Sequence, residues 1–130
     1  MKTHLEIIPA LPIVYMRRTG PYGEQNYQLM EKMKDWIGKN DLQSSASVIY
    51  GIAQDNPSTT PLDKCRYDVC ISVEIPIEDA SIHHGTLPAG EYLIFEVLHT
   101  AEEVQQFWQS VGSALEHEGR QLDHTRPIIE

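Results

Sequence analysis

The chain has 130 residues, of which 10 are Lys or Arg and 19 are Asp or Glu, so its formal net charge at pH 7 is -9. This length corresponds to one domain that can bury a sizeable core without disulfides or a structural metal. The negative charge repels phosphate backbones and anionic membrane surfaces, which argues against direct nucleic-acid or membrane binding, and it attracts cations. No apolar run approaches the roughly 20 residues that span a bilayer, and the N-terminus lacks a signal-peptide core, so we expect a cytoplasmic protein.

The first half of the chain predicts a strand, a helix and a pair of strands. Residues 5–18 are rich in Ile, Val and Tyr, and two prolines interrupt them, as is typical of an edge strand or a bulged strand. Apolar residues then recur at helical spacing over residues 24–39. Residues 47–54 and 65–77 are β-prone runs on either side of the turn-forming segment DNPSTTP, so we expect them to pair antiparallel.

The second half predicts a strand, a helix and the start of a last strand. Residues 91–99 are dense in β-branched and aromatic side chains. Thr100 and Glu103 then have the spacing of a capping box, in which the hydroxyl accepts from one free helix N–H and the carboxylate accepts from another. One apolar stripe follows at helical spacing, made by Val104, Phe107, Trp108, Val111 and Leu115. With RPIIE at residues 126–130 as a strand, the element order indicates an α+β fold with a mostly antiparallel sheet.

Both cysteines lie in the run DKCRYDVCISV, which raises the question of a metal or redox site. Side chains alternate along a strand, so Cys65 and Cys70, five positions apart, point to opposite faces and cannot share a ligand. The sequence has no CxxC pair, no HExxH pattern among its six histidines, no P-loop and no GxSxG motif. We therefore expect structural thiols, no metal and no cofactor. The same alternation places Tyr67 and Val69 on a face that is apolar enough for a core.

The two predicted helices carry large aromatic and thioether side chains at helical spacing. These are Tyr27, Met30, Met33 and Trp36 on the first helix, and Phe107 and Trp108 on the second. Such stripes are typical of a core, but Met and aromatic groups also line adaptable apolar pockets, and aromatic faces attract cations. In a chain of net negative charge, an apolar pocket with one buried carboxylate would select lipophilic cations.

The segment GIAQDNPSTTPLDKCRYDVCISV, residues 51–73, resembles a known family. Its Gly-Ile-x-x-Asp-Asn-Pro, Thr-Pro and Cys-Arg-Tyr-Asp-x-Cys pieces are similar to those of GyrI-like small-molecule-binding domains, the effector-binding domains of AraC-type transcription regulators. The pieces RRTGPYG, LPAGEYLIFEV and RPIIE resemble further motifs of this family in the right order. The resemblance covers essentially the whole chain.

The resemblance implies two strand-helix-strand-strand modules related by a pseudo-twofold axis. In that arrangement both helices lie on one face of a shared antiparallel sheet, with a ligand groove between them. Residues 1–130 would form a single such domain that lacks the family's final strand and has no DNA-binding domain. Because an unpaired sheet edge recruits a neighbour, a homodimer is one expected partner arrangement.

The resemblance also implies a ligand class and a set of site residues. Family members bind hydrophobic, often cationic compounds, and a glutamate in the groove recognises the positive charge. By its position in RPIIE, that residue is Glu130. The aromatic groove lining is expected to come from Tyr67, Trp108, Trp36, Phe95 and Tyr92.

Three functions remain open from the sequence. The first is non-enzymatic binding of lipophilic cationic small molecules, as a sensor or a sequestering module. The second follows from GyrI-like proteins that resemble hydrolases of strained cyclopropane-containing compounds, in which Glu130 would act as general base on water and Tyr67 would polarise the substrate. The third is inhibition of a partner protein through the acidic surface.

Overall fold

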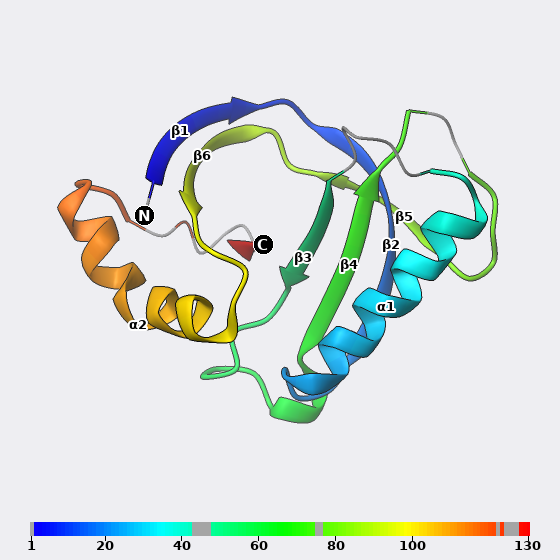
Figure 1. Ribbon diagram of the computed structural model, residues 1–130, viewed down its shortest axis with the longest axis horizontal. Coiled ribbons are helices and arrows are strands. Elements are labelled where there is room, and N and C mark those ends of the chain that lie inside the picture. The colour runs from blue at the N-terminus through cyan, green and yellow to red at the C-terminus, as the bar shows by residue number, and fades with distance from the viewer. Residues whose placement is uncertain (1, 43–47, 75–76, 122, 124–127) are drawn as a thin grey trace. The chain divides into compact units, whose positions relative to one another are not determined.

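The computed structural model describes residues 2–42, 48–74, 77–121, 123 and 128–130, and its ribbon is drawn in Figure 1. Its elements in chain order are β1 (Lys2–Ile8), β2 (Leu11–Thr19), α1 (Glu24–Lys39), β3 (Ile49–Ala53), a 3-10 turn (Leu62–Lys64), β4 (Arg66–Ser72), β5 (His83–Leu87), β6 (Gly90–Glu96), α2 (Ala101–His117) and β7 (Ile128–Ile129). Helices and antiparallel strands together confirm the predicted α+β class.

The chain folds into two compact units. Unit 1 holds residues 1–9 and 89–126, and unit 2 holds residues 10–88 and 127–130. The described strands form two sheets, one with the order β1-β6 and one with the order β5-β2-β4-β3-β7. This differs from the single shared sheet that the resemblance implied, because no described strand pairs with the second edge of β6 or with the second edge of β7.

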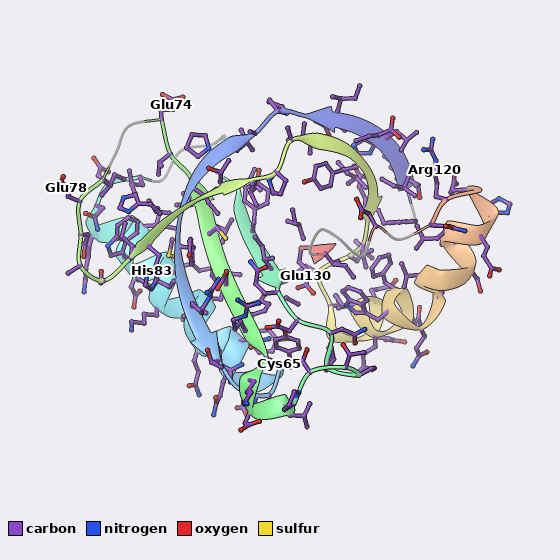
Figure 2. All side chains as sticks on the ribbon, turned by 180° about the vertical axis from the view of Figure 1, so that it is seen from behind. Cys65, Glu74, Glu78, His83, Arg120 and Glu130 are labelled. Carbon is purple, nitrogen blue, oxygen red and sulfur yellow. The ribbon has the colours of Figure 1, made fainter. Side chains whose placement is uncertain are left out.

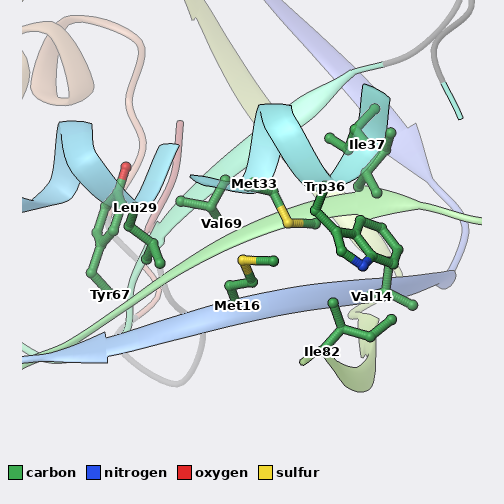
Figure 3. Close-up of a cluster of buried hydrophobic side chains, with 10 residues drawn as sticks. Val14, Met16, Leu29, Met33, Trp36, Ile37, Tyr67, Val69 and Ile82 are labelled. Atoms are coloured by element: carbon green, nitrogen blue, oxygen red, sulfur yellow. The ribbon is translucent and has the colours of Figure 1, made fainter. Parts of the chain in front are cut away.

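In unit 2, α1 crosses one face of the five-stranded sheet (Figure 1). Its buried residues are Leu29, Met33, Trp36 and Ile37, a spacing that puts them on one side of the helix. They pack with side chains of β2 and β4 in the cluster drawn in Figure 3, which includes Val14, Met16, Tyr67, Val69, Ile71 and Ile82. Met33 and Ile37 are 0% and 1% exposed, so each contributes about 1.5–3 kcal/mol of hydrophobic free energy.

The predicted alternation along β4 is confirmed. Val69 packs against α1 in the first cluster, whereas Cys70 lies in a second cluster on the opposite face with Ile13, Ile52 and Leu87. Cys65 precedes the strand, and its Sγ lies 3.6 Å from the carbonyl oxygen of Pro61. Both thiols are free and fully buried, so they serve as packing groups in two separate places.

The first predicted strand is in fact two strands. β1 pairs with β6, whereas β2 pairs with β4 and β5, so the chain changes sheets at residues 9–10. Pro9 stands at this change, and a proline has no N–H to extend a ladder. Strand β5 was not predicted, because His83–Leu87 has weak β-propensity and is held at the sheet edge by pairing with β2.

Unit 1 consists of the β1–β6 ribbon and α2. The ribbon runs in continuous antiparallel register from Lys2 opposite Glu96 to Ile8 opposite Gly90. One half of the predicted capping box of α2 is confirmed, since the Thr100 hydroxyl accepts from the Glu103 N–H at 3.2 Å. The Thr100 N–H, expected to donate to the Glu103 carboxylate, donates instead to the carbonyl oxygen of Leu98 at 2.8 Å. The apolar stripe of α2 is only partly covered, and none of the described α2 residues is fully buried. Neither described helix is long and apolar enough to cross a membrane.

Candidate functional site

The turn between β3 and β4 is held by a two-point ion pair. Asp55 Oδ2 accepts from Arg66 Nε at 2.9 Å and from the Arg66 backbone N–H at 2.8 Å, and Oδ1 accepts from Arg66 Nη2 at 3.0 Å. The hydrogen bonds from the Arg66 side chain lower the pKa of Asp55 below its ordinary value. Bidentate pairing of this kind fixes geometry as well as charge, so the Asp of the DNP segment and the Arg of the RYD segment define the start of β4.

A second ion pair lies two positions further along β4. Asp68 is 2% exposed, and its two oxygens accept from Arg17 Nε at 2.7 Å and Arg17 Nη2 at 2.9 Å. Gln54 Nε2 also donates to Oδ2 at 3.0 Å. The hydrogen bond to Asp68 raises the pKa of Arg17. Three donors satisfy this buried carboxylate, so Asp68 is structural and ties β2 to β4.

Tyr22, from the GPYG segment that precedes α1, also contacts the turn between β3 and β4 and the start of β4. Its hydroxyl donates to the carbonyl oxygen of Arg66 at 2.8 Å and accepts from the Asp55 N–H at 3.1 Å. Its ring meets the Tyr67 ring edge to face, with 6.2 Å between the ring centroids. Tyr22 therefore holds both the backbone and one side of Tyr67.

Tyr67 and Glu130 come together at Gly51 of β3. Gly51 and Glu130 exchange two backbone hydrogen bonds, of 2.9 and 2.7 Å, and Gly51 also lies opposite Val69 of β4. Paired residues of an antiparallel ladder share a face, so Glu130 belongs to the face of the sheet that Val69 and Tyr67 share. The hydroxyl of Tyr67 fills the space that a Cβ on Gly51 would occupy. Figure 2 labels Glu130, and Figure 3 shows the Tyr67 hydroxyl at one end of the cluster.

The electrostatics of this pair follow from burial and proximity. Burial first, and then the charge of Glu130, raise the pKa of Tyr67 to about 12. At neutral pH the phenol is therefore protonated and can donate a hydrogen bond. The arrangement offers an exposed carboxylate, Glu130, on the same sheet face as a buried neutral phenol, Tyr67, and such a carboxylate can pair with a single positive charge.

Trp36 lies elsewhere in unit 2. It is 7% exposed within the α1 core, and its Nε1 donates to Asp79 Oδ2 at 2.9 Å. Figure 3 shows Trp36 and Tyr67 at opposite ends of the buried cluster. The structure thus places this predicted groove residue in the hydrophobic core.

The remaining predicted residues belong to unit 1. Phe95 lies 5.4 Å, centroid to centroid, from Phe107, which lies 5.3 Å from Trp108. Trp108 is 39% exposed, so this aromatic cluster is partly open to solvent. Tyr92 is three positions from Phe95 on the regular strand β6 and therefore points to the other face.

A pocket of about 280 Å³ opens where β6 ends and α2 begins. Apolar, acidic and neutral polar side chains line it together: Glu96, Val97, Leu98, Glu103, Gln106, Phe107 and Ser110. Sequence reasoning did not single out this pocket, because its walls come from a loop and from the first turns of a helix whose stripe was assigned to the core. Within the part of the chain that the structure describes, no three His, Cys, Asp or Glu side chains are arranged to hold a metal.

Sequence reasoning also missed Gly51 and Tyr22. Gly51 begins the Gly-Ile-x-x-Asp-Asn-Pro piece that carries the family resemblance, but its role depends on the pairing of β3 with β4 and β7, which that piece alone does not show. For Tyr22 a signal existed, since GPYG is one of the segments that carry the family resemblance.

Comparison with known proteins decides the family. The model of the GyrI-like small molecule binding domain matches residues 1–130. The chain belongs to this family. The SPbeta prophage-derived protein YosT of Bacillus subtilis (strain 168) is 41% identical over 135 residues, covering 100% of this chain and 87% of YosT. A DNA gyrase inhibitor of Pectobacterium carotovorum subsp. carotovorum (strain PC1) is 24% identical over 123 residues, covering 92% of this chain and 79% of the inhibitor.

Among solved structures, SAV2435 bound to tetraphenylphosphonium shares the GyrI-like fold. The two structures superpose with a TM-score of 0.66 at 17% sequence identity, covering 99% of this chain and 81% of SAV2435. At this identity the likeness establishes a common fold. It confirms the fold class that the resemblance predicted.

Proposed function

We propose that this GyrI-like domain binds hydrophobic organic cations without changing them chemically, with Glu130 as the counter-charge. The observation that carries the proposal is the meeting of Tyr67 and Glu130 at Gly51. Glu130 pairs through its backbone with Gly51 on the sheet face that carries the core, and the Tyr67 hydroxyl fills the space at the same glycine. The domain would serve as a sensor or a sequestering module.

The physical argument rests on the cost of desolvation. A lipophilic cation loses little hydration free energy when it leaves water, because its charge is spread over a large apolar body. A carboxylate at an apolar surface therefore distinguishes such a cation from a neutral molecule of the same shape. The net charge of -9 raises the local concentration of cations around the whole chain. The tetraphenylphosphonium bound to SAV2435 is a ligand of this chemical class.

For unit 1 we propose a separate role in apolar contact. The ring cluster of Phe95, Phe107 and Trp108 offers a partly exposed aromatic surface, and aromatic faces attract cations. Trp108→Ala should weaken the binding of every large apolar ligand, charged or neutral. Tyr92, on the other face of β6, should have a smaller effect.

The test compares one charged and one neutral ligand of similar size. Isothermal titration with tetraphenylphosphonium and with triphenylphosphine oxide is performed on the unaltered protein and on Glu130→Gln. We expect Glu130→Gln to weaken phosphonium binding by roughly tenfold or more, as for removal of one member of a close charge pair, and to leave phosphine oxide binding unchanged.

Glu31→Gln is the matched control, because Glu31 is an exposed carboxylate of α1 whose side chain is 73% exposed. It removes the same formal charge from an exposed position of α1 that is no part of the proposed site, and both affinities should stay as in the unaltered protein. Equal losses in the two Glu variants would show that only the overall charge matters. No binding of either ligand would refute the proposed function.

A second function, hydrolysis, is favoured by the same pair of residues. A carboxylate can act as general base on water, and a Tyr hydroxyl whose pKa is raised to about 12 stays protonated as a donor to the substrate. Incubation with a strained cyclopropane-containing electrophile, followed by mass spectrometry, tests this. Ring-opened product that disappears in both Glu130→Gln and Tyr67→Phe would support hydrolysis, and unchanged substrate would exclude it for that compound.

A further inference from the structure

Gly51 is a glycine because a side chain approaches its backbone. A Cβ built on Gly51 would overlap the hydroxyl oxygen of Tyr67 and would lie 3.1 Å from Tyr67 Cζ. Gly51 is not among the described glycines with positive φ, so the requirement is space and not backbone conformation. By contrast, a Cβ on Gly38 of α1 would meet nothing within 4 Å.

The side chain of Tyr67 cannot easily move away to make space for a Cβ on Gly51. Its ring packs in the buried cluster beside α1, Tyr22 contacts it edge to face, and the residue is 7% exposed. Glu130 is equally fixed at its backbone by two hydrogen bonds to Gly51. Gly51 therefore contacts both groups. The Tyr67 hydroxyl occupies the space of its missing side chain, and the backbone of Glu130 pairs with its backbone.

We propose that Gly51 is a specificity-determining position, whose missing side chain holds the Tyr67 hydroxyl beside Glu130 and so sets the preference for a cation over a neutral ligand. The inference rests on the proposed cation binding and deepens it. A fixed neutral donor next to the carboxylate orients it before the ligand arrives, and pre-organisation of this kind strengthens charge recognition. Any side chain at position 51 would push the phenol away and leave the carboxylate less well oriented.

The experiment measures a ratio of affinities, not an affinity alone. Binding of tetraphenylphosphonium and triphenylphosphine oxide is titrated against the unaltered protein, Gly51→Ala and the control Gly38→Ala. We expect the phosphonium-to-oxide affinity ratio to fall by roughly tenfold in Gly51→Ala, which corresponds to about 1.4 kcal/mol. The ratio should not change in Gly38→Ala, which also replaces a glycine of unit 2 by alanine.

A double variant separates this role from simple damage to the fold. Tyr67→Phe removes the oxygen that a Cβ at position 51 would strike, so Gly51→Ala should cost less thermal stability in the Tyr67→Phe background than in the unaltered protein. In that background Gly51→Ala should also leave the affinity ratio unchanged, because the hydroxyl is already absent. The affinity ratios of Tyr67→Phe and of the double variant can be compared even if Gly51→Ala alone does not fold.

The outcomes distinguish the inference from the function on which it rests. If the unaltered protein binds neither ligand, the proposed function and the inference are both refuted. If it binds phosphonium in a Glu130-dependent way but Gly51→Ala keeps the same ratio, only the role of Gly51 is refuted. A change of ratio on adding Gly51→Ala to Tyr67→Phe would also refute it, since the effect would not pass through the hydroxyl.

Discussion

Arg17 and Asp68 form a two-point ion pair across β2 and β4, with 2.7 Å between Arg17 Nε and Asp68 Oδ1 and 2.9 Å between Arg17 Nη2 and Asp68 Oδ2. The carboxylate is buried while the arginine side chain is 32% exposed. This asymmetry matters because the buried member depends on its partner far more than the exposed member does.

Arg17→Ala should therefore destabilise the protein by about 2–4 kcal/mol, since it leaves the Asp68 charge buried with fewer donors. Urea unfolding followed by circular dichroism measures the free energy of unfolding. Arg120→Ala is the control, because Arg120 pairs with Glu91 at 2.9 Å on the surface and should cost no more than about 1 kcal/mol. Similar losses in the two variants would contradict the structural role of Asp68.

Tyr67 should make the folded state sensitive to alkaline pH. Its pKa rises from 10.0 to about 12 on folding, so the stabilisation of the protonated phenol is complete below pH 10 and is lost as the pH rises through about 12. Stability measured from pH 9 to 12 should fall less steeply in Tyr67→Phe than in the unaltered protein. Comparison of the two proteins cancels the contribution of Cys70, whose pKa is also raised to about 12 by burial. Parallel curves would show that Tyr67 is more accessible than the structure indicates.

Tyr22→Phe should destabilise unit 2 by about 1–2 kcal/mol. The change removes the hydroxyl that bridges the Asp55 N–H and the Arg66 carbonyl oxygen while keeping the ring that supports Tyr67. Tyr27→Phe is the matched control, because Tyr27 is 68% exposed on α1 and its loss of a hydroxyl should be nearly neutral. Chemical denaturation measures the free energy of unfolding of the two variants, and equal values would contradict the bridging role of the Tyr22 hydroxyl.

Thr100→Ala should cost about 1 kcal/mol by leaving the Glu103 N–H without its cap at the start of α2. Ser110→Ala, in the middle of the same helix, should be close to neutral, since that hydroxyl donates to carbonyl oxygens of its own helix, those of Gln106 at 2.9 Å and Phe107 at 3.3 Å. Amide hydrogen exchange in the first turn of α2 reports the difference directly. Equal protection in both variants would show that the cap contributes nothing.

The success of sequence reasoning depended on how local each signal was. The bounds of α1 were predicted as residues 24–39 because an apolar stripe and a stop segment lie within the helix itself. The family match then supplied Glu130 and Tyr67, which the structure brings to the same face of one sheet. β5 could not be predicted, since its short histidine-containing run becomes a strand only by pairing with β2, more than 60 residues earlier in the chain.

The candidate site was harder to predict than the fold for the same reason. Trp36 and Tyr67 both looked like groove residues in a stripe or a motif. Trp36, however, packs at one end of the buried core, and the Tyr67 hydroxyl fills the space that a side chain on Gly51 would occupy. A periodic pattern shows which side of an element is apolar. It does not show whether a helix, a ligand or a neighbouring backbone covers that side.

The burial of both native thiols has a practical consequence for the tests above. Only a thiolate reacts readily with maleimides, and Cys65 and Cys70 are each 0% exposed, with the pKa of Cys70 far above neutral pH. A cysteine placed at the exposed position of Glu31 should therefore be the preferred site of a fluorescent label. The domain then becomes a single-dye reporter whose emission can be followed as organic cations are added, without removal of either native cysteine.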